Sequence, residues 1–140
     1  MSGLKLEDLT VGQTAERSHT VTEATIAAFA EVSGDHNPVH LDAEFAATTS
    51  FKERIAHGML SAAYISAVLG NDLPGPGAIY LSQTLNFRRP VKIGDVVTAK
   101  VTVAAIDEEK ARVTFTTVCE VAGKAVVTGE AVIMAPRRDA

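Results

Sequence analysis

The sequence has 140 residues, of which 46 % are hydrophobic and 21 % charged, and its formal net charge at pH 7 is −4. A chain of this length and hydrophobic content can bury a real core and is not intrinsically disordered, so we predict a single domain over residues 1–140. Its acidic balance, without a basic stripe, argues against a nucleic-acid partner.

Cysteine content and hydropathy bear on the compartment. The one cysteine, Cys119, lies in an alternating, strand-like run, and we interpret it as a small core residue rather than a nucleophile. The first residues include acids and lack the apolar stretch of a signal peptide. The most apolar segment, 55–70, is shorter than the about 20 residues that span a bilayer. We therefore expect a cytoplasmic protein that does not associate with membranes.

The first predicted elements are a strand and a helix. Residues 13–21 alternate weakly and favour a strand. The apolar period then changes, which predicts a helix over residues 23–33. Thr22 is a good N-cap for this helix, and Gly34 is a good residue to end it.

A loop and two further helices are expected next. Pro38 lacks an amide hydrogen, so we expect residues 34–42 to form a loop. Asp42 is a suitable N-cap for a short helix in the sequence AEFAAT. Residues 57–69 predict a second long helix, closed by Gly70. This helix is apolar nearly all round, which is typical of a helix buried on most faces.

The rest of the chain is β-rich, and DEEK and AGK are suitable hairpin turns. Consecutive strands joined by short turns predict an antiparallel sheet. We expect an α+β, hot dog-like layout in which a curled antiparallel sheet wraps around one long buried central helix. The four predicted segments are 79–91, 95–107, 110–123 and 124–136.

The segment SGDHNPVH carries the densest group of chemically active side chains. His36 and His40 are four residues apart, but Pro38 between them argues against paired metal ligands on one helix. No cysteine or third histidine lies near enough in sequence to complete a zinc set, so we predict no metal. Asp35 and His40 suit acid–base chemistry, with Asn37 holding the loop or contacting substrate. The alternative is a polar loop in which the aspartate is a cap and the histidine is solvated.

Gly58 lies in the first turn of the second long helix. Amides there have no partner inside the helix, and glycine allows a ligand to approach closely, so this amide can bind an oxyanion. The alternative, that Gly58 merely permits tight helix–sheet packing, is about equally favoured by this residue alone. We interpret His57 as structural, orienting the loop or buried and hydrogen-bonded.

At this point two long segments resemble a known family. SGDHNPVHLDAEFAATTSFKERIAHGML is similar to the signature of MaoC-like, (R)-specific enoyl-CoA hydratases, and LPGPGAIYLSQTLNFRRPVKIGDVVTAKVTV resembles the strand region of that family. The similarity covers about residues 10–136, and the short chain resembles the free-standing enzymes that feed polyhydroxyalkanoate synthesis. The resemblance implies a hot dog fold, a homodimer, and addition of water to a trans-2-enoyl-CoA to give an (R)-3-hydroxyacyl-CoA.

The resemblance also implies site residues. It matches the family's catalytic aspartate and histidine with Asp35 and His40, and the glycine whose amide holds the thioester oxygen with Gly58. It implies no metal or redox cofactor, because coenzyme A enters as the carrier of the acyl substrate. The supporting residues that it implies are Asn37, Ser66 as the helix serine, and Leu69 and Val132 in the acyl pocket.

Other interpretations remain open. Arg88, Arg89 and Lys92 either meet the phosphates of coenzyme A or are solvated charges at strand ends. An acyl-CoA thioesterase or a non-catalytic acyl-CoA-binding module is consistent with the same fold. A dehydratase that runs the same step backwards would use the same site.

Overall fold

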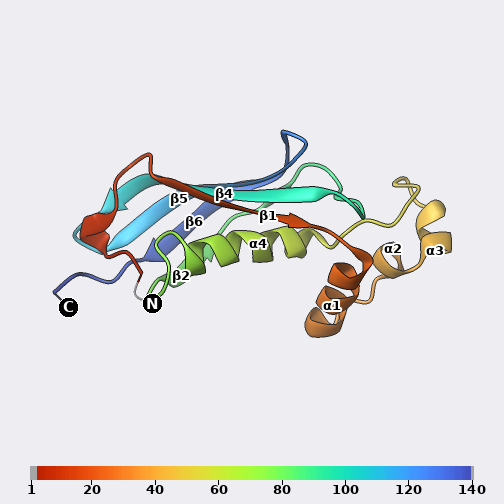
Figure 1. Ribbon diagram of the computed structural model, residues 1–140, viewed down its shortest axis with the longest axis horizontal. Helices are drawn as coiled ribbons and strands as arrows, with labels where there is room; N and C mark the ends of the chain where they lie inside the picture. The colour runs from red at the N-terminus through yellow and green to blue at the C-terminus, as the bar shows by residue number, and fades with distance from the viewer. Residues whose placement is uncertain (1–2, 140) are drawn as a thin grey trace.

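The computed structural model describes residues 3–139 as an antiparallel sheet of six strands with a long helix lying along it (Figure 1). The strand order is β1-β4-β5-β6-β2, and β3 also pairs with β6. This arrangement confirms the predicted α+β layout. In chain order the elements are η1 (Leu6–Asp8), β1 (Thr14–Thr20), α1 (Glu23–Ser33), α2 (Pro38–Leu41), α3 (Ala43–Ala47), α4 (Gly58–Asn71), β2 (Ile79–Gln83), β3 (Asn86–Phe87), β4 (Val96–Asp107), β5 (Arg112–Val121) and β6 (Lys124–Met134).

The core lies between α4 and the inner face of β4, β5 and β6. Alternate residues of these strands are buried, as a half-buried sheet requires, and Phe115 is among the largest of the fully buried side chains. Ala122 and Gly123 have φ angles of 52° and 78°, which gives the β5–β6 hairpin a tight two-residue turn with the twist that paired strands prefer. Burying each large side chain contributes about 1.5–3 kcal/mol, so this layer dominates stability.

The prediction for α4 is correct in character but incomplete. The sheet stays open and covers one side of the helix, so the helix is not enclosed within a single chain (Figure 1). The two sides of α4 are both apolar but differ in side-chain size. The large branched side chains face the sheet, and mainly small residues face outward. The helix also runs through Gly70 to Asn71 rather than ending before Gly70. The buried positions are Leu60, Ser61, Ile65, Val68 and Leu69, and exposed ones include Met59, Ala63 and Ser66.

The β-rich segment predicted over 79–91 is only partly correct as a strand, because it forms two short strands, β2 and β3, and ends at Phe87. The amide of Thr84 donates to the carbonyl of Glu130 at 2.8 Å, and the chain crosses very close to β6 there. A Cβ on Gly129 would lie 1.9 Å from the carbonyl oxygen of Thr84. The missing side chain at Gly129 therefore creates the space in which the strand breaks.

The loop predicted over 34–42 is only partly correct, since one helical turn, α2, forms inside it. Pro38 occupies the first helical position, where a missing amide hydrogen costs nothing. The side chain of Asn37 caps this turn by accepting from the amide of Val39 at 3.1 Å. Proline thus starts this turn instead of preventing it.

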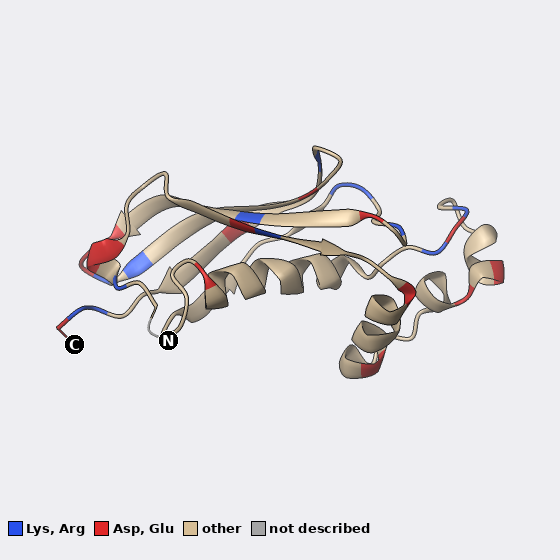
Figure 2. Cartoon of the chain, viewed as in Figure 1, with Lys and Arg blue, Asp and Glu red and all other residues tan. Residues whose placement is uncertain are grey.

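Charge and hydropathy agree with this architecture. Figure 2 shows α4 without a charged residue along its length, while acidic and basic residues lie in the loops, on the strands and on the other helices. Among the described residues, no helix is both long enough and apolar enough to cross a bilayer.

Candidate active site

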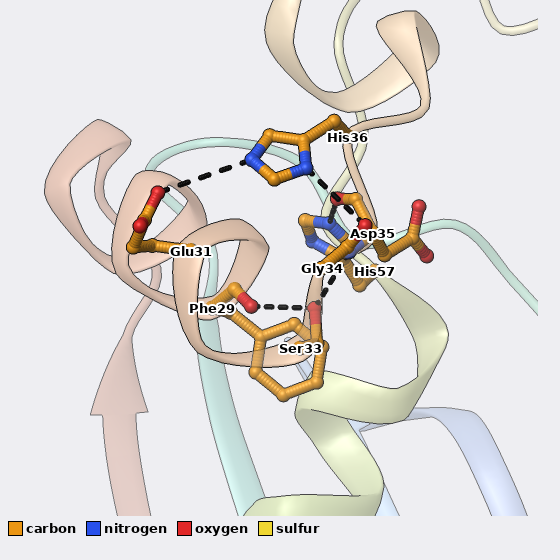
Figure 3. Close-up of polar contacts among 7 residues, drawn as sticks. All are labelled: Phe29, Glu31, Ser33, Gly34, Asp35, His36 and His57. Carbon is orange, nitrogen blue, oxygen red and sulfur yellow. Dashed lines mark hydrogen bonds and ion pairs between the residues drawn. The ribbon is translucent and has the colours of Figure 1, made fainter.

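The end of α1 positions Asp35. Gly34 adopts the left-handed conformation (φ 78°) that ends the helix, as the sequence predicts. The hydroxyl of Ser33 donates to the carbonyl of Phe29 at 2.6 Å and accepts the amide of Asp35 at 3.1 Å (Figure 3). One carboxylate oxygen of Asp35 accepts the amide of Asn37 at 3.2 Å. The carboxylate is therefore oriented by the backbone and still exposed.

His40, on α2, is 8 % exposed, and its Nδ1 lies 2.7 Å from the carbonyl oxygen of Ile55. A carbonyl can only accept, so Nδ1 carries the hydrogen and Nε2 keeps a free lone pair. Burial lowers the pKa of His40, although the Ile55 hydrogen bond and the charge of Asp35 oppose this effect. The imidazole is therefore neutral near pH 7 and able to accept a proton at Nε2.

His57, the N-cap residue of α4, contacts both Asp35 and His40. It is 2 % exposed, and its Nε2 donates to the main-chain carbonyl of Asp35 at 3.0 Å. Its ring stacks on that of His40 with centroids 3.9 Å apart and planes inclined by 28°. The loop-orienting interpretation of His57 agrees with these contacts. Its Nδ1 is buried without a hydrogen-bond partner among residues 3–139.

Asp35, His40 and His57 also form a group whose potential ligand atoms lie within 4.8 Å of one another. His57, which is 17 residues from His40 in sequence, is brought in by the fold as the third histidine or cysteine that was not expected near the loop. A metal lies close to the plane of each imidazole that binds it. Two stacked rings inclined by only 28° have planes that meet far from either ring. The arrangement therefore suits proton transfer better than metal ligation.

A pocket of about 480 Å³ opens beside His40 and the first turn of α4. Gly58 lines it, and no residue in the described range 3–139 accepts a hydrogen bond from its amide. A Cβ on Gly58 would lie 2.7 Å from the ring of Phe87, so only glycine lets that ring close over the helix start. The pocket therefore combines a neutral imidazole with an unpaired amide at the positive end of a helix. Its other lining residues include Phe51, Ser61, Arg88, Arg89 and Val91.

The remaining sequence-predicted residues do not all join this pocket. Ser66 is exposed two turns along α4 and lines a second hollow of about 590 Å³ with Tyr80 and Leu81. Leu69 is buried in the core, and Val132 is half-buried on the strand position between the inward-facing residues of β6. Neither lines either pocket in one chain, so the structure lends no support to their predicted acyl-binding role.

The charged residues near the pocket divide into two groups. Arg88 and Arg89 lie on the wall, whereas Lys92 pairs with Glu53 at 3.3 Å. Arg54 directly precedes the IAHGML segment and no role was predicted for it; its Nε donates to the main-chain carbonyl of His40.

An antiparallel sheet along a long helix, with His40 and the amide that opens that helix on one pocket and Asp35 beside His40, fits a hot dog-fold enzyme of the hydratase and dehydratase class. Comparison with known sequences identifies the family: residues 8–127 match the model of the MaoC like domain, and the chain belongs to this family. The (R)-specific enoyl-CoA hydratase of Rhodospirillum rubrum is 57 % identical over 132 residues, covering 94 % of this chain and 92 % of that protein.

Solved structures agree. The R-hydratase PhaJ1 from Pseudomonas aeruginosa, in its unliganded form, superposes with a TM-score of 0.92 and 54 % identity, covering 97 % of this chain and 88 % of that one. The (R)-hydratase from A. caviae involved in PHA biosynthesis gives a TM-score of 0.90 and 50 % identity, covering 93 % and 99 %. The predicted family and hot dog fold are both confirmed.

Proposed function

We propose that this protein is an (R)-specific enoyl-CoA hydratase, a hydro-lyase that adds water reversibly to a trans-2-enoyl-CoA to give an (R)-3-hydroxyacyl-CoA. One observation carries the proposal: His40, whose Nε2 is free, and the unpaired amide of Gly58 line the same pocket, and the carboxylate of Asp35, although it is not on the pocket wall, lies within 4.8 Å of the imidazoles of His40 and His57. The identity of 57 % to the R. rubrum hydratase supports it.

In this proposal the imidazole of His40 and the amide of Gly58 act at opposite ends of the conjugated enoyl thioester. Nε2 of His40 takes a proton from water as the oxygen bonds to C3 of the enoyl group. Negative charge then builds on the thioester oxygen, where the amide of Gly58 and the helix dipole stabilise it. Asp35 positions the water and relays to C2 the proton that His40 has accepted, so that both groups end the reaction in their starting protonation states. The reaction neither oxidises nor reduces the substrate, so it needs no redox group, and in this proposal the amide of Gly58 stabilises the thioester oxygen without a metal.

Coenzyme A enters as part of the substrate. Arg88 and Arg89 line the pocket and offer positive charge to its phosphates. The side chain of Arg88 donates to the hydroxyl of Thr128 at 3.1 Å, which holds the guanidinium near the wall. Lys92 is less suited to this role because it already pairs with Glu53.

The functional unit in this proposal is a homodimer. The edge strand β2 exposes Ile79, Tyr80 and Leu81, and the open side of α4 beside it exposes Met59. A free strand edge and a neighbouring apolar face are typical of a surface that a second copy covers. Light scattering on the purified protein tests this, and a mass of one chain at micromolar concentration would contradict it.

We also propose that the enzyme acts in the cytoplasm and supplies (R)-3-hydroxyacyl units for polyester synthesis. The free, buried Cys119 is consistent with a reducing compartment. The A. caviae relative is described as involved in PHA biosynthesis, which supports the second part.

Turnover of a series of trans-2-enoyl-CoAs tests the central proposal. The expected result is loss of the enoyl absorbance without release of free thiol, and a product of the (R) configuration by chiral analysis. Release of free coenzyme A would instead identify a thioesterase, and saturable binding without turnover would identify an acyl-CoA-binding module.

A further inference from the structure

Arg54 contacts the catalytic segment from outside the pocket. Its Nε donates to the main-chain carbonyl of His40 at 2.8 Å, and its Nη1 donates to a carboxylate oxygen of Glu23 at 2.6 Å. The Arg54 side chain is 16 % exposed, whereas that of Glu23 is 73 % exposed. A largely buried guanidinium therefore links the first turn of α1 to the end of α2, the two elements on either side of Asp35.

The bond from Arg54 is one of three hydrogen bonds that join residues 39–40 to residues 54–55. The amide of Ile55 donates to the carbonyl of Val39 at 3.3 Å, and the carbonyl of Ile55 accepts the ring Nδ1 of His40 at 2.7 Å. The same short stretch, residues 54–55, therefore holds the backbone of α2 and fixes the tautomer of the catalytic imidazole. If α2 shifts, the ring loses its alignment with the Ile55 carbonyl.

Helix α2 has only four residues and cannot hold its own position. Its last carbonyls have no partner within the helix, and Arg54 satisfies the one on His40. The planar fork of arginine donates in two directions at once, which the single ammonium of lysine does not reproduce. The link thus depends on arginine in particular.

We infer that Arg54 is a positioning residue for the hydration reaction, acting through the backbone of His40 to keep its Nε2 directed at the reacting water. This inference rests on the proposed function for its kinetic consequence. Its structural content, that Arg54 holds the imidazole of His40 in one tautomer and one place, is independent of the substrate.

The kinetic test compares Arg54→Met and Arg54→Lys with the control Arg17→Met. Arg17 forms a two-pronged ion pair with Asp72, at 2.6 and 3.0 Å, and neither residue lines the catalytic pocket. We expect Arg54→Met to lower kcat about 10- to 100-fold with KM within about twofold, since small displacements of a catalytic group have effects of this size. Arg54→Lys should recover only part of the loss, and Arg17→Met should keep wild-type kcat.

A double-mutant cycle separates positioning from general destabilisation. If Arg54 acts through His40, Arg54→Met causes no further loss of kcat in a His40→Ala background. An equal fold-loss in both backgrounds would overturn the inference, as would a wild-type kcat in Arg54→Met.

Nitrogen NMR of histidine-labelled protein supplies a readout that needs no substrate. The wild-type spectrum should show His40 with its hydrogen on Nδ1, and Arg54→Met should shift it toward a mixture of tautomers while Arg17→Met leaves it unchanged. An unchanged His40 signal in Arg54→Met would overturn the inference. A wild-type protein that hydrates no enoyl-CoA would refute the proposed function, while this spectrum would still decide the role of Arg54.

Discussion

The sheet with α4 and the segment 34–57 are built on different principles. Strands β4, β5 and β6 bury alternate side chains and join through continuous backbone ladders. In segment 34–57 only four residues are buried, and side-chain-to-backbone bonds hold much of it in place. Two of those four, His40 and His57, belong to the site itself. Stability therefore depends mainly on the first region and chemistry on the second. A substitution should be able to lower kcat without unfolding the protein, or to lower the free energy of unfolding without lowering kcat.

Replacing the acid–base pair should have the largest effect. We expect His40→Ala and Asp35→Ala each to lower kcat by about 10²–10⁴-fold, because each removes a group that handles a proton in the transition state. Neither variant should unfold, since the sheet is untouched, and circular dichroism with thermal melting checks this. Rates close to wild type in either variant would refute the assignment of that residue.

Truncating the sheet core should show the opposite pattern. Phe115 is fully buried on β5, and Phe115→Ala should lower the free energy of unfolding by about 3–5 kcal/mol through lost burial and the cavity left behind. Denaturant titration measures this loss. At a temperature where the variant remains folded, kcat should stay near the wild-type value; a loss of kcat comparable to that of His40→Ala would contradict the division between the two regions.

The start of α4 belongs to both regions, and a pair of substitutions at Gly58 separates its two roles. Gly58→Pro removes the donor amide at a position where helices accept proline, and we expect kcat to fall about 10²–10³-fold. Gly58→Ala keeps the amide but introduces the same close approach to Phe87. Steady-state kinetics should therefore show a much smaller loss of kcat for alanine; equal losses in both variants would mean that crowding, not the amide, is responsible.

The pH profile gives the smallest expected effect. Because burial lowers the pKa of His40 and the base must be unprotonated, kcat/KM should fall as the pH drops through that lowered pKa. The acid limb should therefore lie below about 6.5, the ordinary value for histidine, and activity should persist to lower pH than an exposed base allows. A limb centred above that value would contradict the assignment of a buried, neutral His40 as the base.

The same division explains what the sequence could predict. Local signals placed α1 between Thr22 and Gly34, and the motif identified Asp35 and His40 as neighbours of one loop. The break between β2 and β3 was missed because its cause, Gly129, lies on another strand. The stacking of His57 on His40 was missed because only the folded chain brings them together. The exposed face of α4 was not predicted, because hydropathy does not distinguish a small apolar residue from a large one.

The pairing of residues 39–40 with residues 54–55 has a consequence for changing substrate preference. It holds together the two ends of the segment 41–53, here called the arm. The arm contains α3 and places Phe51 on the pocket wall. Insertions or deletions between these fastened ends would reshape the wall that Phe51 supplies while leaving His40 and Gly58 where they are. The arm is thus a segment whose exchange should alter the pocket wall without moving the catalytic groups.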